Sequence, residues 1–152
     1  MSRTDDGPGP ELSRRLGYLL KHAQLLMAEL NAKALAPYGL NGREVAVLLV
    51  IADREPTSQQ QAAQRLGIDR TTMVAMLDAL EGKGLVSRHP DADDRRRNVV
   101  ELTDAGKDTL RRAAKASDDA ERQFLAPLSA QAAEQLRDSL QALVFHPDSE
   151  SS

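Results

Sequence analysis

Three consecutive arginines form the most distinctive chemical group in the chain. Arg95, Arg96 and Arg97 directly follow a segment of three aspartates and one alanine. A guanidinium can enter a narrow minor groove of duplex DNA, whereas a carboxylate that faces DNA is repelled by the phosphates. We therefore interpret Asp94 as an internal partner that holds an arginine in place. The alternative is an ordinary solvated run of charges without a ligand.

A second polar group stands at the beginning of a predicted helix. When a helix enters the major groove N-terminus first, its first two turns present side chains to base edges. An arginine there can bind guanine or phosphate, and a threonine offers its hydroxyl to phosphate and its methyl to thymine. The alternative is a solvated arginine followed by ordinary first-turn threonines. The residues in this position are Arg70, Thr71, Thr72, Ala75 and Met76.

A third group lies near the beginning of the chain, where Arg15, Tyr18 and His22 fall at helical spacing beside an apolar stripe. They offer a cation, a ring and a titratable donor above an apolar floor, which suits an anionic aromatic ligand. The alternative is a solvated arginine and two side chains at the edge of a subunit interface. We predict this ligand site between the helices at 11–36 and 104–146, which we expect to form a dimer interface, and a DNA-binding lobe at 40–102.

Enzymatic chemistry finds no support in the sequence. The 152 residues include no cysteine and only three histidines, which are far apart, so thiol catalysis and metal-ligand spacing are lacking. The sequence also contains no glycine loop that could cradle a phosphate and no nucleophile elbow. We predict a protein that is not an enzyme and binds no cofactor.

Charge and aromatic content narrow the class of nucleic acid. A net charge of −3 argues against non-specific coating of nucleic acid, and 3% aromatic residues are too few for a single-strand stacking platform. The expected target is therefore duplex DNA. The longest apolar run, Val45 to Ala52, is too short for a membrane helix, and residues 1–10 do not form a signal peptide. We expect a cytoplasmic protein without a membrane partner.

Hydrophobic periodicity and capping residues explain how the first half of the chain positions these groups. Apolar residues at three- and four-residue steps predict a long first helix from Glu11 to the residue before Pro37. Asn41 and Glu44 form a capping box in front of Val45 to Ala52. This box favours a buried helix there over a buried strand, which the apolar run alone would also allow.

Two further helices and a hairpin follow. Ser58 and Gln61 form a second capping box at the start of a helix that Gly67 ends, and Asp69 caps a helix that ends at Gly82. Strands at 85–88 and 98–102 around the polar loop 89–97 come next, and then helices capped by Thr103 and Ser129. Two helices joined by a tight glycine turn and followed by a hairpin have the order of a winged helix-turn-helix. The predicted fold is therefore mainly α with a small β-hairpin.

These motifs resemble the MarR family of transcription regulators. The run Asp94-Arg95-Arg96, then Leu102-Thr103 and Gly106, is similar to the wing of that family, and 58–72 with 77–86 is similar to its helix-turn-helix. The resemblance covers residues 11–144. It implies that Arg96 enters the minor groove, that Asp94 tethers it, and that residues 70–76 form the major-groove surface. Ser58, Arg95 and Arg97 complete the expected DNA contacts.

The resemblance also implies an obligate homodimer that binds a pseudo-palindromic operator through its paired lobes. Members of the family are often released from DNA by small aromatic acids or phenols, and repression is their commoner mode, with activation left open. Peroxide sensing by a cysteine is excluded because the chain has none. Two alternatives remain: a winged-helix module that binds only proteins, and a DNA-binding regulator without a small ligand.

The expected organisation is a single chain with one DNA-binding part. We expect a lobe at 40–102 and dimerisation helices at 11–36 and 104–146, with disordered tails at 1–10 and 147–152.

Overall fold

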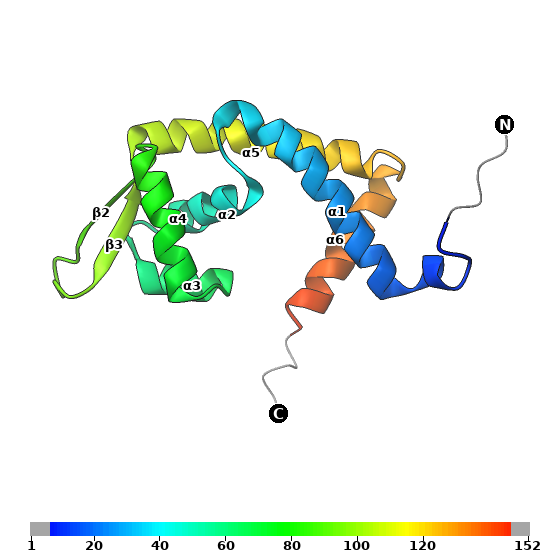
Figure 1. Ribbon diagram of the computed structural model, residues 1–152, viewed down its shortest axis with the longest axis horizontal. Coiled ribbons are helices and arrows are strands. Elements are labelled where there is room, and N and C mark those ends of the chain that lie inside the picture. The colour runs from blue at the N-terminus through cyan, green and yellow to red at the C-terminus, as the bar shows by residue number, and fades with distance from the viewer. Residues whose placement is uncertain (1–6, 147–152) are drawn as a thin grey trace.

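The computed structural model describes residues 7–146, which fold into a winged-helix lobe and an elongated helical part (Figure 1). Residues 1–6 and 147–152, which belong to the two expected tails, lie outside the described residues. The helices are α1 (Leu16–Leu35), α2 (Gly42–Asp53), α3 (Gln59–Leu66), α4 (Arg70–Gly82), α5 (Asp104–Leu125) and α6 (Ala130–Val144), the strands are β1 (Thr57–Ser58), β2 (Val86–Pro90) and β3 (Asn98–Leu102), and the short 3-10 helices η1 and η2 cover Leu12–Arg14 and Ala36–Tyr38.

Both predicted capping boxes are present and fix the beginnings of α2 and α3. The Asn41 side chain accepts a hydrogen bond from the Glu44 amide at 2.9 Å, and the Glu44 carboxylate accepts one from the Asn41 amide at 3.0 Å. Ser58 and Gln61 make the same reciprocal pair of hydrogen bonds. These bonds satisfy amide groups that a helix start otherwise leaves without partners.

The remaining helix boundaries in the lobe also follow the sequence. Gly67 ends α3 in the left-handed conformation with φ of +66°, which a residue without a Cβ adopts freely. The Asp69 side chain then accepts from the Thr72 amide and starts α4. The predicted glycine turn between the two helices is therefore confirmed.

The sheet differs from the predicted hairpin in two respects. It has three antiparallel strands in the order β1-β3-β2, because the two residues of β1 pair with Val99 and Val100 of β3. Two residues are too short to show an alternating pattern, so the sequence gives no sign of this strand. In addition, β2 continues to Pro90, and His89 lies in the strand opposite Val99 instead of in the loop.

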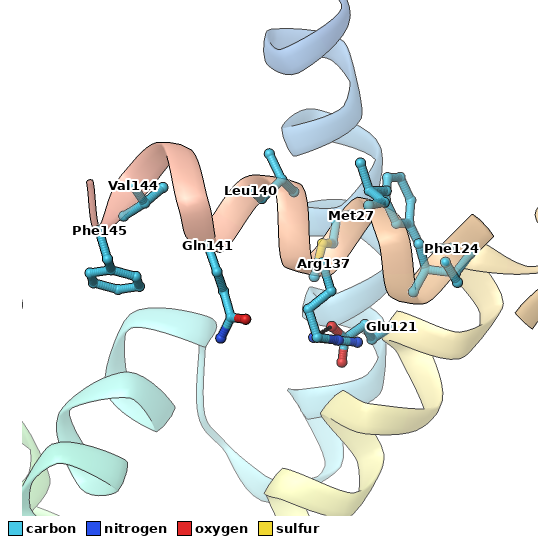
Figure 2. A pocket seen from close by; sticks show the side chains of 11 residues that line it. Met27, Glu121, Phe124, Arg137, Leu140, Gln141, Val144 and Phe145 are labelled. Carbon is cyan, nitrogen blue, oxygen red and sulfur yellow. Dashed lines mark ion pairs between the residues drawn. The ribbon is translucent and has the colours of Figure 1, made fainter. Parts of the chain in front are cut away.

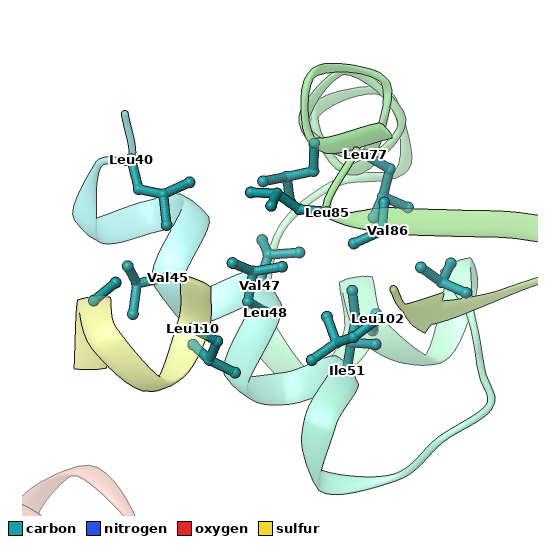
Figure 3. Packing of buried hydrophobic residues seen from close by; sticks show 14 of the residues in the cluster. Leu40, Val45, Val47, Leu48, Ile51, Leu77, Leu85, Val86, Leu102 and Leu110 are labelled. Atoms are coloured by element: carbon teal, nitrogen blue, oxygen red, sulfur yellow. The ribbon is translucent and has the colours of Figure 1, made fainter. Parts of the chain in front are cut away.

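The core of the lobe lies where α2, α4, the sheet and the first turns of α5 meet (Figure 3). Leu48, Ile51, Met73 and Leu77 are among its fully buried side chains. Burying each such side chain stabilises the fold by about 1.5–3 kcal/mol. Helices α2–α4 and strands β1–β3, which we call the lobe, are therefore held together by contacts within one chain and pack on the beginning of α5.

The first helix begins later than predicted. The η1 turn closes when the Arg15 amide donates to the Leu12 carbonyl, and Arg15 itself is extended, with ψ of 130°. The α-helix therefore starts at Leu16 instead of Glu11. Apolar spacing does not reveal this one-residue break, because Leu12 and Leu16 keep a four-residue step on both sides of it.

The C-terminal half of α1 packs along α5 and connects the lobe to the elongated part. The Ser117 hydroxyl of α5 donates to the Asn31 side chain of α1 at 2.7 Å, and Ala113 and Ala120 of α5 are buried beside this contact. Small residues allow the two helices to approach closely.

Helices α1 and α6, which we call the arm, are left mostly exposed. The only buried residue of α1 is Leu35, and no residue of α6 is buried. Within residues 7–146 no single helix is long and apolar enough to cross a membrane. The pair Leu16–Tyr38 and Gly42–Asp53 reaches the required length and composition only when taken together, and it is bent by 71°.

Candidate nucleic-acid interface

The two arginine-bearing groups that the sequence singles out line one concave surface. A cavity of about 350 Å³ lies between α3, the beginning of α4 and the wing, which is the loop 91–97 with its flanking strands. Arg70 of α4 and Arg96 and Arg97 of the wing all line it. The fold thus brings together side chains that lie 26 positions apart in the sequence, and the surface between them is cationic.

The wing loop holds Arg96 in the way that the sequence predicts. The Arg96 Nε donates to Asp94 Oδ1 at 3.3 Å, and the Arg96 amide donates to the same oxygen at 3.1 Å. The Arg96 side chain is nevertheless 92% exposed, so the carboxylate supports its base and leaves its tip in solvent. Within residues 7–146 no side chain pairs with Arg95 or Arg97.

Helix α4 has a buried apolar face and an exposed face on its opposite side. Met73, Leu77 and Leu80 point into the core, while Arg70, Thr71 and Ala75 are exposed. Hydrogen bonds from the Thr72 side chain and from the Thr72 amide lower the pKa of Asp69, so this carboxylate stays charged at the N-terminus of the helix.

Two predicted contact residues have additional structural roles. Met76 is half-buried and packs against the core. Ser58 is only 4% exposed, and its hydroxyl oxygen caps α3, although the residue also lines the cationic cavity. Ser58 can therefore contact a ligand only through its hydroxyl proton or its second lone pair.

Arg88 ties the wing to α4 and was not singled out by the sequence. Its Nη2 donates to Asp78 at 2.5 Å and to Glu81 at 2.8 Å, and its Nη1 donates to Gln59 of α3 at 3.2 Å. The hydrogen bond with Glu81 raises the pKa of Arg88 and lowers that of Glu81. The side chain is 17% exposed, so these bonds hold β2 at a fixed position relative to α4.

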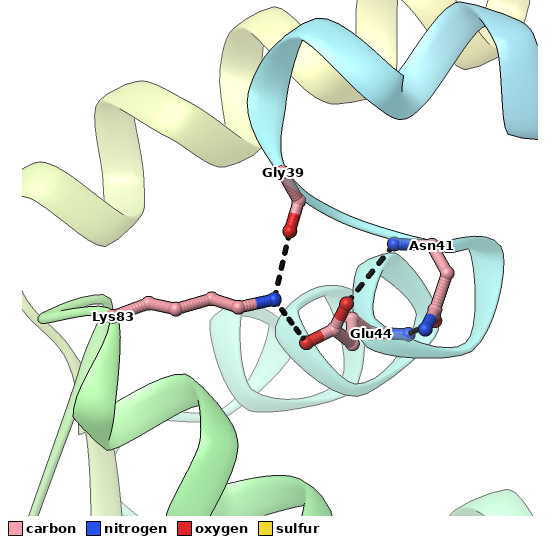
Figure 4. A network of polar contacts seen from close by, with 4 residues as sticks. All are labelled: Gly39, Asn41, Glu44 and Lys83. Carbon is pink, nitrogen blue, oxygen red and sulfur yellow. Dashed lines mark hydrogen bonds and ion pairs between the residues drawn. The ribbon is translucent and has the colours of Figure 1, made fainter.

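A second polar network joins the end of α4 to the beginning of α2 (Figure 4). The Lys83 ammonium donates to the Gly39 carbonyl at 2.7 Å and to the Glu44 carboxylate at 2.8 Å. Glu44 is buried and also belongs to the capping box of α2. The buried carboxylate is therefore both paired with a charge and hydrogen-bonded, as burial of a charge requires.

The predicted ligand residues lie together on the first turns of α1. The rings of Tyr18 and His22 have centroids 4.2 Å apart and are tilted by 36°, while Arg15 precedes the helix and is exposed. A cavity of about 800 Å³ lies between α1 and α2. Its first lining residue in the sequence is Gln24, which follows the predicted residues, and Lys83 also lines it. None of the three predicted residues lines that cavity within a single chain.

A groove between α1, α5 and α6 is lined mainly by apolar side chains (Figure 2). Its volume is about 310 Å³, with Met27, Phe124 and Leu140 around it. At one edge Arg137 of α6 pairs with Glu121 of α5 at 2.8 Å, which raises the pKa of Arg137. Next to the groove, Leu143 is 67% and Phe145 75% exposed.

Comparison with known proteins identifies similar sequences and structures. The MarR family model matches residues 38–97. The transcriptional repressor CouR bound to a 23-mer DNA duplex has a TM-score of 0.85 and 38% identity, covering 94% of this chain and 99% of that one. CouR from Rhodococcus jostii RHA1 bound to p-coumaroyl-CoA has a TM-score of 0.77 and 31% identity, covering 89% and 95% of the two chains.

A relative that was found by its sequence is also a transcriptional repressor, and it matches a shorter part of the chain. The HTH-type transcriptional repressor NicR of Pseudomonas putida is 30% identical over 97 residues, which is 63% of this chain. The match spans 61% of the length of NicR.

Proposed function

The chain belongs to the MarR family of transcription regulators, and from this premise we propose that it is a homodimeric repressor that binds duplex DNA at a pseudo-palindromic operator. The family consists of regulators, which confirms the prediction that the chain is not an enzyme. One observation supports the proposal most: Arg70, Arg96 and Arg97 line a single concave surface between α4 and the wing. The relative CouR, which has the same fold, is bound to a DNA duplex.

In this proposal the two sides of the cationic surface read different grooves. Helix α4 enters the major groove, where Arg70, Thr71 and Ala75 on its outward face meet base edges and phosphates. The wing places the exposed tip of Arg96 in the adjacent minor groove, and Asp94 restricts its rotamers. Thr72 and Met76, which are half-buried, contribute at the edge of the contact.

The arm supplies the surface for dimerisation. Leucines of α1 are exposed, and so are apolar side chains of α6 such as Leu140 and Val144, which border the groove in Figure 2. Within residues 7–146 of one chain nothing buries these side chains. Exposed apolar surface of this extent is characteristic of a subunit interface. A two-fold dimer presents two α4 helices to successive major grooves, so the half-site centres lie about 10 base pairs apart or a multiple of that.

The test begins with selection of an operator from a pool of randomised duplexes, followed by light scattering at micromolar protein concentration. We expect a dimer and a selected sequence with two-fold symmetry.

Arg96→Ala then weakens operator binding by about 1–3 kcal/mol, because a charged hydrogen-bonding group is lost from the interface. Folding stays unchanged, since the side chain is exposed. Unchanged affinity at matched salt, or a monomer that binds one half-site tightly, contradicts the proposal and favours a module that binds only proteins.

We further propose that a small aromatic carboxylate or phenol releases the dimer from DNA. The neighbouring, tilted rings of Tyr18 and His22 and the guanidinium of Arg15, which has no partner within residues 7–146, offer complementary chemistry at the beginning of α1. CouR, a relative with the same fold, is bound to p-coumaroyl-CoA. Such a ligand releases DNA only if it binds more tightly to a dimer whose α4 helices are wrongly spaced.

Titration of salicylate and related carboxylates into the operator complex tests the ligand site. We expect release for the wild type and a much higher ligand requirement for a variant with Arg15→Ala and His22→Ala. Equal release in both proteins places the ligand elsewhere. No release by any aromatic acid or phenol leaves a regulator without a small ligand.

A further inference from the structure

The basic side chains of the lobe fall into two groups. The first group forms ion pairs with carboxylates and consists of Arg54, Arg65, Lys83, Arg88 and Arg96. The second group has no partner within residues 7–146 and consists of Arg43, Arg70, Arg95 and Arg97. Arg70 and Arg97 line the cationic cavity described above, and Arg95 belongs to the same wing loop. Arg43 is the member that belongs to neither the cavity nor the loop.

Arg43 stands on the other side of α4 from the wing. It is the second residue of α2, it is exposed, and it lines a concave surface of about 420 Å³ together with Thr71, Thr72 and Ala75 of α4. The cavity beside the wing is lined by Arg70 and, one turn further along α4, by Val74. Residues at these positions lie on opposite flanks of one helix. Cations therefore border the outward face of α4 on both sides.

The electrostatic surroundings of Arg43 leave its charge available. The nearest acidic residue in the chain is Glu44, whose carboxylate already accepts hydrogen bonds from Lys83 and from the Asn41 amide (Figure 4). The only other polar side chains on this concave surface are an asparagine and the two threonines. Glu44 lines the same surface, but within residues 7–146 its carboxylate pairs with Lys83 and not with Arg43. The guanidinium is therefore available to an external anion.

We propose that Arg43 binds a phosphate of duplex DNA, on the strand that runs along the flank of α4 away from the wing. This inference rests on the proposed function. An α-helix with its side chains is about 10–12 Å wide, and the major groove is about 12 Å wide, so the helix fills the groove. A group beside the helix then meets the sugar-phosphate backbone and not the base edges. The planar guanidinium fork fits phosphate with two hydrogen bonds.

The experiment compares Arg43→Gln with the wild-type dimer on the selected operator and on a random duplex of equal length, over a range of salt concentrations. We expect both affinities to fall by a similar factor of about ten, because phosphate contacts carry no sequence information. The slope of log K against log salt becomes shallower by about 2, since a dimer loses two phosphate contacts. Arg43→Lys keeps most of the slope, because the charge remains.

Arg54→Gln is the matched control. Arg54 is an exposed arginine of the same lobe, lies outside both cavities beside α4, and pairs with Asp53 at 3.8 Å. We expect its affinity and salt slope to equal those of the wild type. Thermal unfolding of all three variants stays unchanged, because neither arginine is buried.

The outcomes separate this inference from the proposed function. If Arg96→Ala weakens operator binding and Arg43→Gln changes neither affinity nor slope, the role of Arg43 is overturned and the proposed function stands. If neither variant has an effect, both fail. A loss for Arg43→Gln that occurs on the operator and not on the random duplex assigns Arg43 to base recognition and overturns the phosphate contact.

Discussion

The lobe and the arm of this molecule complete their packing in different ways. In the lobe, apolar residues of α2, α3, α4, β2 and β3 bury one another and pack on the beginning of α5, and capping residues close the helix ends. In the arm, α6 has no buried residue and α1 has one, although both carry many leucines. The same residue type therefore stabilises the lobe within one chain and stays exposed in the arm, where the proposed dimer would bury it.

Truncation of a leucine in each region gives the largest expected contrast. Leu77 is fully buried in the lobe, so Leu77→Ala lowers the free energy of unfolding by about 2–5 kcal/mol at any protein concentration. Leu143 is exposed in the arm, so the effect of Leu143→Ala depends on protein concentration, as expected when dimerisation stabilises the fold. Urea unfolding at several concentrations measures both. A concentration-independent loss for Leu143→Ala would show that the arm is stabilised within one chain.

A charged side chain on the arm is expected to weaken the proposed subunit interface. Leu143→Glu raises the dimer dissociation constant by at least about a hundredfold, roughly 3 kcal/mol, because two carboxylates enter an apolar interface. Sedimentation equilibrium measures the change. Leu49→Glu, at a leucine of α2 with 49% exposure, is the control and leaves the dimer intact. Equal effects of the two substitutions would remove the distinction between arm and lobe.

The close packing of the first turn of α5 on the lobe depends on Gly106. A Cβ at this position would lie 1.9 Å from the Leu85 carbonyl oxygen, so the first turn of α5 must move away from β2. Alanine favours a helix over glycine by about 1 kcal/mol, but overpacking costs about 1–3 kcal/mol, and at this distance the clash exceeds the gain. We expect Gly106→Ala to lower the melting temperature. Gly82→Ala, which meets no atom within 4 Å, is the control and does not lower it.

The smallest expected effect concerns His89 in the wing. Its ring hydrogen-bonds to Glu101 across β2 and β3 at 3.1 Å, which raises the pKa of His89 above its usual value. The pair therefore stabilises the wing below the usual histidine pKa, and this contribution disappears as the pH rises through the raised pKa. The pair is exposed, so the effect is small. NMR titration checks it: Glu101→Gln lowers the pKa of His89, and an unchanged pKa rules out the interaction.

Features that depend on neighbouring positions in the sequence could be predicted well. Asn41 with Glu44 and Ser58 with Gln61 stand three residues apart, and this spacing alone brings each pair within hydrogen-bonding distance at a helix start. The tether between Asp94 and Arg96 also lies within one short loop.

Features that depend on tertiary packing could not be predicted. Arg88 reaches three residues on two helices, and Lys83 reaches a carbonyl 44 positions away. Neither pairing has a local pattern, because any exposed arginine or lysine would look the same in the sequence. Strand β1 was missed for the same reason, since its two residues form a strand only because β3 lies beside them.

The hydrogen bond from Lys83 to Gly39 couples the orientation of α4 to that of α1. Lys83 stands at the end of α4, and Gly39 belongs to the turn that follows α1, so the direction of one helix constrains that of the other. The 20 residues of α1 span about 30 Å. With the N-terminal end of α1 held in the proposed dimer interface, a rotation of the coupled helices by about 6° about that end displaces the Gly39 end by about 3 Å, close to the roughly 3.4 Å rise of one base pair. In a dimer, an angular change this small is enough to shift the spacing of the two α4 helices out of register with DNA.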